Sequence, residues 1–148
     1  TLSVYVGKHS SDKPAVWLEN LDYFDSSDYP LETKKDMKDN LGNTYEHALR
    51  CHAATEQYTV YKLNGQDSAI SGTFFKTYET RSLEISSTMK IYGDGELLYS
   101  ASVTSGIDPV EFYVDLTGVL ELKIYCNNFY TYGRYENCAG IGDCGLWA

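Results

Sequence analysis

The sequence predicts an all-β fold, an antiparallel β-sandwich of the jelly-roll type. Apolar residues alternate with polar ones in several runs, which is the pattern of a strand with one buried and one wet face. The runs are short, and turn residues separate them at regular spacing, as in sandwiches. The chain has 148 residues, of which 43% are hydrophobic. That is enough for a core, so we expect residues 1–148 to form one domain.

The clearest alternation lies in the second half of the chain. Residues 110–116 alternate, and residues 120–125 repeat the pattern after the turn Thr117-Gly118. Gly93-Asp94-Gly95 separates two further runs and indicates a β-hairpin. Residues 85–91 fit the scheme less strictly. Further strands are expected at residues 2–6, 15–21, 45–49, 58–63, 69–75 and 141–147.

The polar parts of the chain are predicted to be connections. Residues 31–38 are the only helix candidate, although they lack a sustained apolar stripe. Residues 8–13 and 26–43 are expected to be long surface segments, where functional residues tend to collect.

Composition excludes several classes of partner. Twelve Lys and Arg stand against 21 Asp and Glu, a net charge of −9. This argues against nucleic acid and against anionic membrane surfaces, since both are bound through basic groups. No apolar run approaches the ~20 residues of a membrane-spanning helix, so we expect no membrane insertion. The chain begins at Thr1 without a signal peptide, as expected of a processed chain or an excised piece.

The four cysteines permit three pairings. Cys51 and Cys126 each lie on the apolar face of a predicted strand and should point inward. Two interpretations stay open for them, buried free thiols or a Cys51–Cys126 bridge. Cys138 and Cys144 flank a Gly-rich segment and could close it. No Cys-x-x-Cys occurs, which argues against a zinc ribbon or a thioredoxin-like motif.

Five phrases, in order, resemble a known family. They are Trp17-Leu18-Glu19-Asn20-Leu21-Asp22, Asp39-Asn40-Leu41-Gly42-Asn43-Thr44-Tyr45 with His47-Ala48-Leu49 and His52-Ala53, Ile91-Tyr92-Gly93-Asp94-Gly95-Glu96-Leu97-Leu98-Tyr99, Val114-Asp115-Leu116-Thr117-Gly118-Val119-Leu120-Glu121-Leu122, and Gly140-Ile141-Gly142-Asp143-Cys144-Gly145-Leu146-Trp147. Together they resemble the NPCBM domain, the novel putative carbohydrate-binding module, which is related to carbohydrate-binding module family fifty-one. The resemblance covers residues 17–147.

The resemblance implies a jelly-roll sandwich of a secreted or surface-attached bacterial protein, often beside glycoside hydrolase domains. It also implies binding of galactose-containing glycans and a structural calcium ion. The chain departs from the family pattern at Tyr23, Ala48, Arg50-Cys51 and in residues 78–81. We therefore expect the fold to carry over better than the sugar.

Sugar binding needs flat aromatic faces for the C–H face of a pyranose and fixed polar groups for its hydroxyls. Residues 127–137 are the densest group of both kinds. We expect Tyr130, Tyr132 and Tyr135 to form a platform, with Arg134 taking hydroxyls. The alternative is a Tyr-rich loop that packs on itself.

Two further groups are candidates for the same ligand. Glu79 and Arg81, beside Tyr78, could together hydrogen-bond to two vicinal hydroxyls of a sugar. A solvated surface ion pair between them is the commoner outcome. His52 shares a strand face with Arg50, opposite Cys51, and is expected to face the ligand. A structural histidine bonded to a loop carbonyl is the alternative.

Calcium prefers carboxylate and carbonyl oxygens. Asp22, Asp25 and Asp28 follow one another in one loop, and Asp143 lies near the other terminus. The end strands of a jelly roll can meet, so we expect a structural calcium ion at Asp22, Asp25 and Asp143. A solvated acidic loop is the alternative.

The sequence carries no Gly-x-Ser-x-Gly, His-Glu-x-x-His or phosphate loop, and no carboxylate pair stands out. We therefore expect no catalysis and name no catalytic residue. The first hypothesis is a monomeric, extracellular carbohydrate-binding module that holds a larger protein, such as a glycoside hydrolase, at glycans. The alternative is a structural or protein-interaction sandwich of a bacterial surface protein. A small hydrolase is the least supported.

Overall fold

The computed structural model describes residues 13–63 and 65–148. Almost all of its regular structure is β. In chain order the elements are β1 (Val16–Trp17), η1 (Leu18–Asn20), β2 (Asp25–Ser26), β3 (Glu32–Thr33), β4 (Met37–Lys38), β5 (Thr44–Tyr45), β6 (Ala48–Cys51), β7 (Glu56–Lys62), β8 (Ala69–Lys76), η2 (Tyr78–Thr80), β9 (Ile85–Gly93), β10 (Glu96–Val103), β11 (Val110–Asp115), β12 (Glu121–Tyr130) and β13 (Ala139–Trp147). Neither 3-10 turn in the described part is long and apolar enough to cross a membrane.

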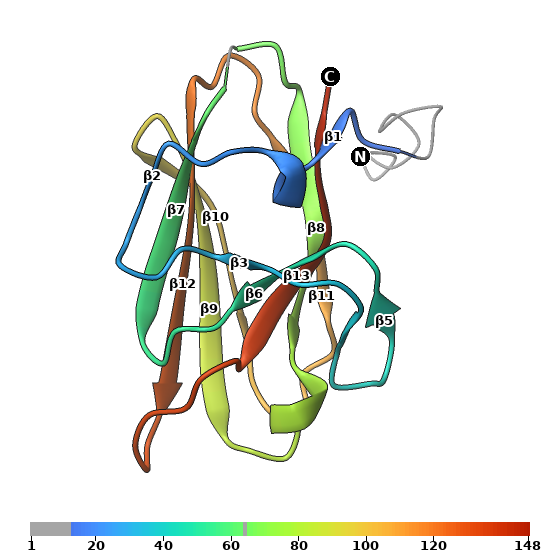
Figure 1. Ribbon diagram of the computed structural model, residues 1–148, viewed down its shortest axis with the longest axis vertical. Helices are drawn as coiled ribbons and strands as arrows, with labels where there is room; N and C mark the ends of the chain where they lie inside the picture. The colour runs from blue at the N-terminus through green and yellow to red at the C-terminus, as the bar shows by residue number, and fades with distance from the viewer. Residues whose placement is uncertain (1–12, 64) are drawn as a thin grey trace.

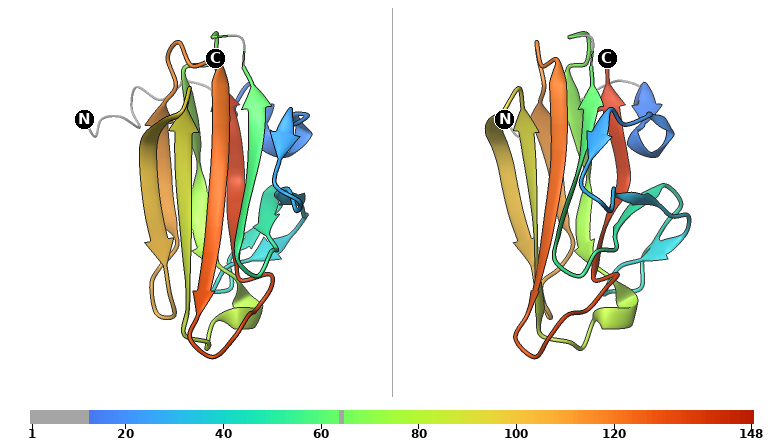
Figure 2. Two further views of the ribbon diagram at one scale, coloured as in Figure 1. Left: turned by 90° about the vertical axis from the view of Figure 1, so that its left-hand side faces the viewer. Right: turned by 60° about the vertical axis from the view of Figure 1, so that its left-hand side comes forward.

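Two antiparallel sheets form the two layers of the molecule (Figures 1 and 2). One sheet has the order β11-β8-β13-β6-β3, with β1 paired to β13, and the other has the order β10-β9-β12-β7-β2. From β7 to β13 the chain crosses to the other sheet at every connection except the β9–β10 hairpin. The predicted antiparallel sandwich of jelly-roll type is confirmed.

The core lies between the two sheets, where alternate residues of the long strands point inward. On β12, Leu122, Ile124 and Cys126 are buried and contribute to the main apolar cluster. Ile70 and Phe74 of β8 contribute to the same cluster from the opposite layer. This is the alternation that the sequence displays, so the inward face of these strands was predictable.

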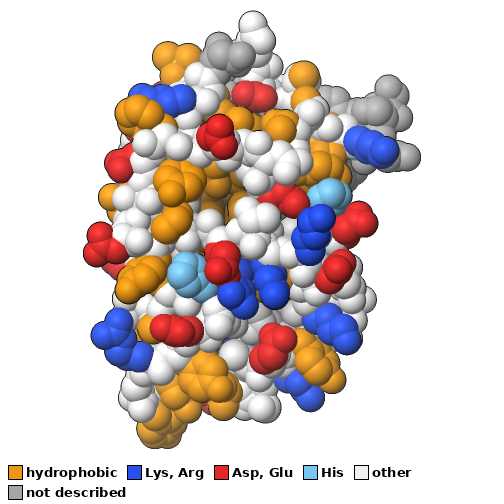
Figure 3. All heavy atoms as spheres, viewed as in Figure 1, with side chains coloured by type: hydrophobic (Ala, Val, Ile, Leu, Met, Phe, Trp, Pro, Cys, Tyr) orange, Lys and Arg blue, Asp and Glu red, His pale blue; other side chains and the backbone are white. Residues whose placement is uncertain are grey.

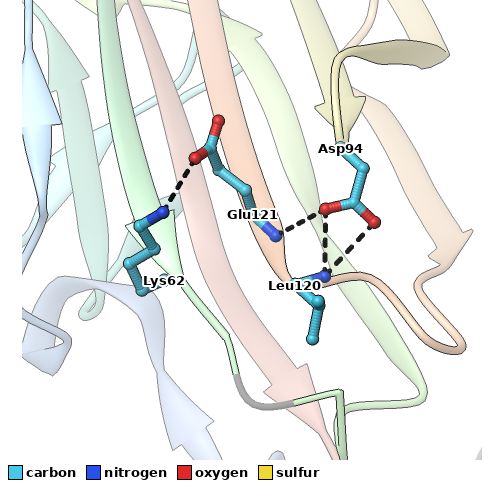
Figure 4. A network of polar contacts seen from close by, with 4 residues as sticks. All are labelled: Lys62, Asp94, Leu120 and Glu121. Carbon is cyan, nitrogen blue, oxygen red and sulfur yellow. Dashed lines mark hydrogen bonds and ion pairs between the residues drawn. The ribbon is translucent and has the colours of Figure 1, made fainter.

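The Gly93-Asp94-Gly95 hairpin is confirmed. Asp94 and Gly95 both have positive φ, 51° and 85°, as in the tight turns that suit the twist of hairpin strands. The Asp94 carboxylate accepts hydrogen bonds from the amides of Glu121 (2.9 Å) and Leu120 (3.2 Å). Glu121 in turn pairs with Lys62 at 3.1 Å (Figure 4). The turn is thereby tied to the start of β12, and β12 is tied to β7.

The first third of the chain differs from the prediction. Residues 31–38 form no helix, because β3 pairs with β6 and β4 pairs with β5. Residues 15–21 form a two-residue strand followed by η1, and residues 45–49 are divided between β5 and β6. The strand expected at residues 2–6 lies outside the described residues.

The β4–β5 hairpin covers the outer face of the six-stranded sheet. Met37 and Phe75 are buried there, and the Tyr45 ring stacks on Phe75 at 4.7 Å with an interplanar angle of 9°. The hairpin can lie this close because β13 presents two glycines to it. A Cβ atom at Gly140 would come within 2.7 Å of the Phe75 ring, and one at Gly142 would overlap the Tyr45 ring. This contact places the hairpin beside the pocket described next.

Candidate functional site

A pocket of about 530 Å³ opens beside η2 and the β12–β13 connection. Three separate segments and one strand residue build its wall. The first segment is residues 34–38, which follow β3 and include β4. The second is residues 77–80, which include η2, and the third is residues 135–137 of the connection between β12 and β13. Arg50 of β6 completes the wall. Figure 1 shows that both η2 and the β12–β13 connection lie at the lower end of the molecule.

Backbone hydrogen bonds hold the two lower segments together. The amide of Thr77 donates to the carbonyl of Cys138 at 3.0 Å, and its hydroxyl donates to the carbonyl of Asn137 at 2.9 Å. The Thr77 and Thr80 hydroxyls share a hydrogen bond of 2.8 Å. The amide of Asn137 donates to the carbonyl of His52 at 3.2 Å. The connection is thus fixed to η2 on one side and to the end of β6 on the other.

Asp39 fixes the turn that follows β4, next to the pocket residues Met37 and Lys38. Its carboxylate is fully buried and accepts hydrogen bonds from the amides of Leu41 and Asn43, from the Asn43 side chain, and from the Tyr45 hydroxyl, all between 2.8 and 3.0 Å. Burial acts to raise the pKa of Asp39, but these hydrogen bonds outweigh it and hold the pKa below 3.8. A β-bridge between Asp39 and Thr77 joins this turn to the start of η2.

The charged side chains of the pocket are balanced in sign. Lys34, Lys38 and Arg50 stand against Asp36, Glu79 and Glu136. Arg50 is held by Glu32 of the neighbouring strand, to which its Nε donates at 2.7 Å. Figure 3 shows acidic and basic side chains intermixed over this face of the molecule. Such a wall offers donors and acceptors without a strong net field, which suits a neutral polar guest.

Two cationic side chains lie against the Tyr78 ring. The Arg81 guanidinium lies 3.7 Å from the centre of its ring, and Arg81 Nη1 donates to the Tyr78 carbonyl at 2.7 Å. Lys38 Nζ lies 5.6 Å from the same ring centre. These contacts orient the ring, which is 37% exposed, at the edge of the pocket. Glu79 lines the pocket, whereas Arg81 stacks on Tyr78. The structure therefore does not bring Glu79 and Arg81 together as the expected pair for two vicinal hydroxyls.

The three tyrosines of the expected platform are accessible but not coplanar. Tyr130 meets Tyr132 edge-on at 5.7 Å and 77°, and it meets Tyr135 edge-on at 6.1 Å and 90°. Of the three, Tyr135 lines the pocket and is 43% exposed, whereas Tyr132 is 83% exposed and lies outside it. Arg134 does not line this pocket but a second hollow, which it shares with Ala54 and with residues 135–137 of the connection.

His52 lies on the outward face of its segment, as the alternation predicted, because Cys51 and Ala53 are buried. Its ring meets Tyr29 edge-on at 5.7 Å. Its carbonyl accepts the Asn137 amide. The backbone of His52 therefore supports the β12–β13 connection, whereas its ring does not line the pocket.

The three aspartates expected to hold calcium are not brought together. Asp25 pairs with Val60 in the five-stranded sheet, whereas Asp143 lies on β13 in the other sheet, where its amide donates to the His47 carbonyl at 2.6 Å. Within residues 13–63 and 65–148, no group of three or more His, Cys, Asp or Glu side chains could hold a metal ion. Asp22, Asp25 and Asp143 thus do not fit a shared carboxylate site, and calcium binding stays a prediction.

Sequence reasoning missed much of the wall. Lys34, Asp36 and Lys38 fall in the polar segment 26–43, which was expected to carry function, but nothing in it distinguishes the residues that face the pocket. Their orientation depends on two-residue strands, which are too short to show a period. Arg50 was expected to share the ligand-facing side with His52, and it does line the pocket.

The NPCBM/NEW2 domain model matches residues 14–141. Among solved structures, the CBM51 of Clostridium perfringens GH95 in complex with methyl-galactose is similar, with a TM-score of 0.69, 19% identity, and coverage of 88% of this chain and 98% of that chain. No curated protein matches the sequence.

Two similar structures are larger. One is the M60 catalytic domain with two CBM51 domains of Clostridium perfringens ZmpB (TM-score 0.71, 17% identity, 88% of this chain and 15% of that chain). The other is the tandem CBM51 modules of a family 98 glycoside hydrolase from Streptococcus pneumoniae (TM-score 0.69, 11% identity, 90% and 46%). The chain thus spans less than half the length of both. At these identities the likeness shows a shared fold.

Proposed function

The chain belongs to the NPCBM/NEW2 domain family, and from that premise we propose that it is a non-catalytic carbohydrate-binding module. One observation carries the proposal. The pocket between β4, η2 and the β12–β13 connection combines two tyrosines with a charge-balanced set of donors and acceptors. Its volume of about 530 Å³ is in the range of roughly 300–1,000 Å³ that small-ligand sites occupy.

The wall suits the two surfaces of a sugar. Tyr78 and Tyr135 supply partly exposed rings for the C–H face of a pyranose. Each sugar hydroxyl both donates and accepts hydrogen bonds, so it can be satisfied by a lysine or arginine on one side and a carboxylate on the other. Arg50 is already oriented by Glu32, and Glu79 is held on η2. Arg50 is therefore already ordered before a sugar binds, which lowers the entropy cost of that contact.

The same argument predicts modest affinity, because an open pocket buries only part of a sugar. A module of this kind acts by tethering, which raises the effective concentration of whatever is joined to it near the glycan. We propose that the larger protein is extracellular and that a glycoside hydrolase is the first kind to consider. Similar modules belong to GH95 of Clostridium perfringens and to a family 98 glycoside hydrolase of Streptococcus pneumoniae, which supports this choice.

Galactose-containing glycans are the first ligands to test, since one similar module is described in complex with methyl-galactose. The protein is run on affinity gels that contain galactosylated, plant or host glycans, and retention is compared with a gel without glycan. We expect retardation by at least one glycan. Tyr135→Ala and Tyr78→Ala should each weaken retention about tenfold, the effect of losing 1–2 kcal/mol of stacking and burial.

Tyr132→Ala is the matched control, because Tyr132 lies in the same connection but outside the pocket. It should be retained like the parent protein. Retention by no glycan, or equal losses in the Tyr132→Ala and Tyr135→Ala variants, would overturn the proposed site.

A second candidate function is a protein-interaction sandwich, and one observation favours it. Tyr23, Phe24 and Tyr29 are 51%, 64% and 60% exposed along the segment around β2. Exposed aromatic side chains of this kind are typical of contact surfaces. If no glycan retards the protein, this function becomes the leading one, and loss of self- or partner association in a Tyr23→Ser, Phe24→Ser variant is its test.

A further inference from the structure

Two cysteines meet across the sandwich. Cys51 ends β6 in one sheet, and Cys126 lies within β12 in the other. Both point into the main core and are 0% and 1% exposed. Their Sγ atoms lie 2.8 Å apart.

This separation is shorter than the van der Waals contact of two sulfur atoms. It leaves less than an ångström to the S–S length of about 2.05 Å in a disulfide. The surroundings are apolar, so the core offers the thiols little besides each other. From this geometry we propose that Cys51 and Cys126 form a disulfide bond that joins the two sheets covalently.

The other two cysteines are not placed to compete. Cys138 is the residue before β13, and Cys144 lies six residues further along that strand. At about 3.3 Å per residue of extended chain, the two Cα atoms are roughly 20 Å apart. A disulfide needs Cα atoms within about 7 Å, so Cys138 and Cys144 do not close the Gly-rich segment, a pairing that the sequence left open. Ala139 pairs with Cys51, and the adjacent Cys138 points to the opposite face, where its thiol donates to the Tyr135 carbonyl at 3.1 Å.

Formation of the bond is an oxidation. Each thiol loses one proton and one electron, and an external disulfide, such as oxidised glutathione or that of a thiol–disulfide oxidoreductase, takes up both pairs and becomes two thiols. The hydrogen bond to Cys126 and burial raise the pKa of Cys51, so in the folded chain the reactive thiolate is scarce and inaccessible. The bond therefore forms while the chain folds and is protected from reductants afterwards.

The bond would close a long loop, since 75 positions separate its two ends. Crosslinks across long loops stabilise chiefly by restricting the unfolded chain. Disulfides persist in oxidising compartments, so the bond and the proposed extracellular location support each other without depending on sugar binding.

The test is a peptide map of the full chain. The reduced, unfolded protein is refolded with oxidised glutathione, unfolded again, alkylated with iodoacetamide and digested without reductant. Mass spectrometry should find the Cys51 peptide linked to the Cys126 peptide, two hydrogens lighter than their sum, with Cys138 and Cys144 alkylated. Four alkylated cysteines, or a link between any other pair, would overturn the proposal.

Thermal unfolding supplies a second readout. Protein refolded in the presence of reductant, so that the bond never forms, should have a Tm about 10 °C below that of protein refolded with oxidised glutathione. A Cys138→Ala, Cys144→Ala variant should show the same shift, and a Cys51→Ala, Cys126→Ala variant should show none. An equal Tm for the parent protein after the two refoldings contradicts the bond. If either variant fails to fold, the peptide map of the parent protein decides.

Discussion

Asp39 shows how one side chain organises a wall of the pocket. Its carboxylate gathers the amides of residues 41 and 43, the Asn43 side chain and the Tyr45 hydroxyl, and its backbone bridges to Thr77. Besides its backbone hydrogen bonds, the turn between β4 and β5 is closed by four hydrogen bonds to one buried carboxylate. Buried acceptors of this kind are costly to leave unsatisfied.

Asp39→Asn should therefore destabilise the fold. The amide keeps the shape but replaces an acceptor oxygen with a donor that faces other donors. We expect the free energy of unfolding at pH 7 to fall by about 1–3 kcal/mol, measured by urea denaturation. Asp115→Asn is the control, because Asp115 is exposed and its change should cost less.

The same carboxylate gives a pH dependence. Because the folded pKa of Asp39 lies below 3.8, its contribution to stability is complete above that unfolded value and is lost as the pH falls through the folded one. The parent protein should lose stability below about pH 4, where the unfolded carboxyl takes up its proton. The Asp39→Asn variant should show a smaller loss over the same interval. Parallel curves for the two proteins would contradict the assignment.

At the scale of elements, the β4–β5 hairpin connects the sheet to the pocket. It lies flat on β13 because Gly140 and Gly142 have no side chains, and it carries Met37 and Lys38 into the pocket wall. A methyl group at Gly142 would overlap the Tyr45 ring. The hairpin would have to move outward, together with the residues it presents.

Gly142→Ala should lower the free energy of unfolding by about 1–3 kcal/mol, the usual cost of overpacking, and should also weaken glycan retention. Chemical denaturation and affinity gels measure the two effects. In a Tyr45→Ala background the cost of Gly142→Ala should shrink, because the obstructing ring is gone. An equal cost in both backgrounds would show that the hairpin does not depend on this contact.

Strand length decides what could be predicted from the sequence. The long strands β9, β11 and β12 show their alternation, and with it the inward direction of Cys126 and the hairpin at Asp94. The strands β2 to β5 have two residues each, a single period of the strand alternation, which cannot show a repeat, so residues 31–38 were mistaken for a helix candidate. The site follows the same rule. Tyr78, Glu79 and Tyr135 were found by composition, whereas Lys34 and Asp36 depend on tertiary pairings.

At the scale of the whole molecule, overall and local charge differ. The chain carries a formal −9, yet the pocket holds three acidic and three basic side chains. The net charge keeps polyanions such as nucleic acids away. The balanced pocket remains suited to a neutral guest.

Retention of the parent protein on a neutral glycan should therefore be nearly independent of salt. Between about 0.05 and 0.5 M NaCl, screening weakens interactions between separate charges but leaves stacking and short hydrogen bonds largely intact. Affinity electrophoresis or gel retardation at several salt concentrations measures this. A tenfold loss of retention over that interval would indicate an ionic ligand and contradict the neutral guest.

Two of the segments that line the pocket, η2 and the β12–β13 connection, lie at the lower end of the molecule, whereas the C-terminus lies near its upper end (Figure 1). This polarity determines how the protein should be mounted on a biosensor. A biotin attached at Ala148 would leave the pocket directed away from the chip. Amine coupling would instead modify Lys34 and Lys38 and obstruct it, so an absence of signal from an amine-coupled surface would report the mounting and not the protein.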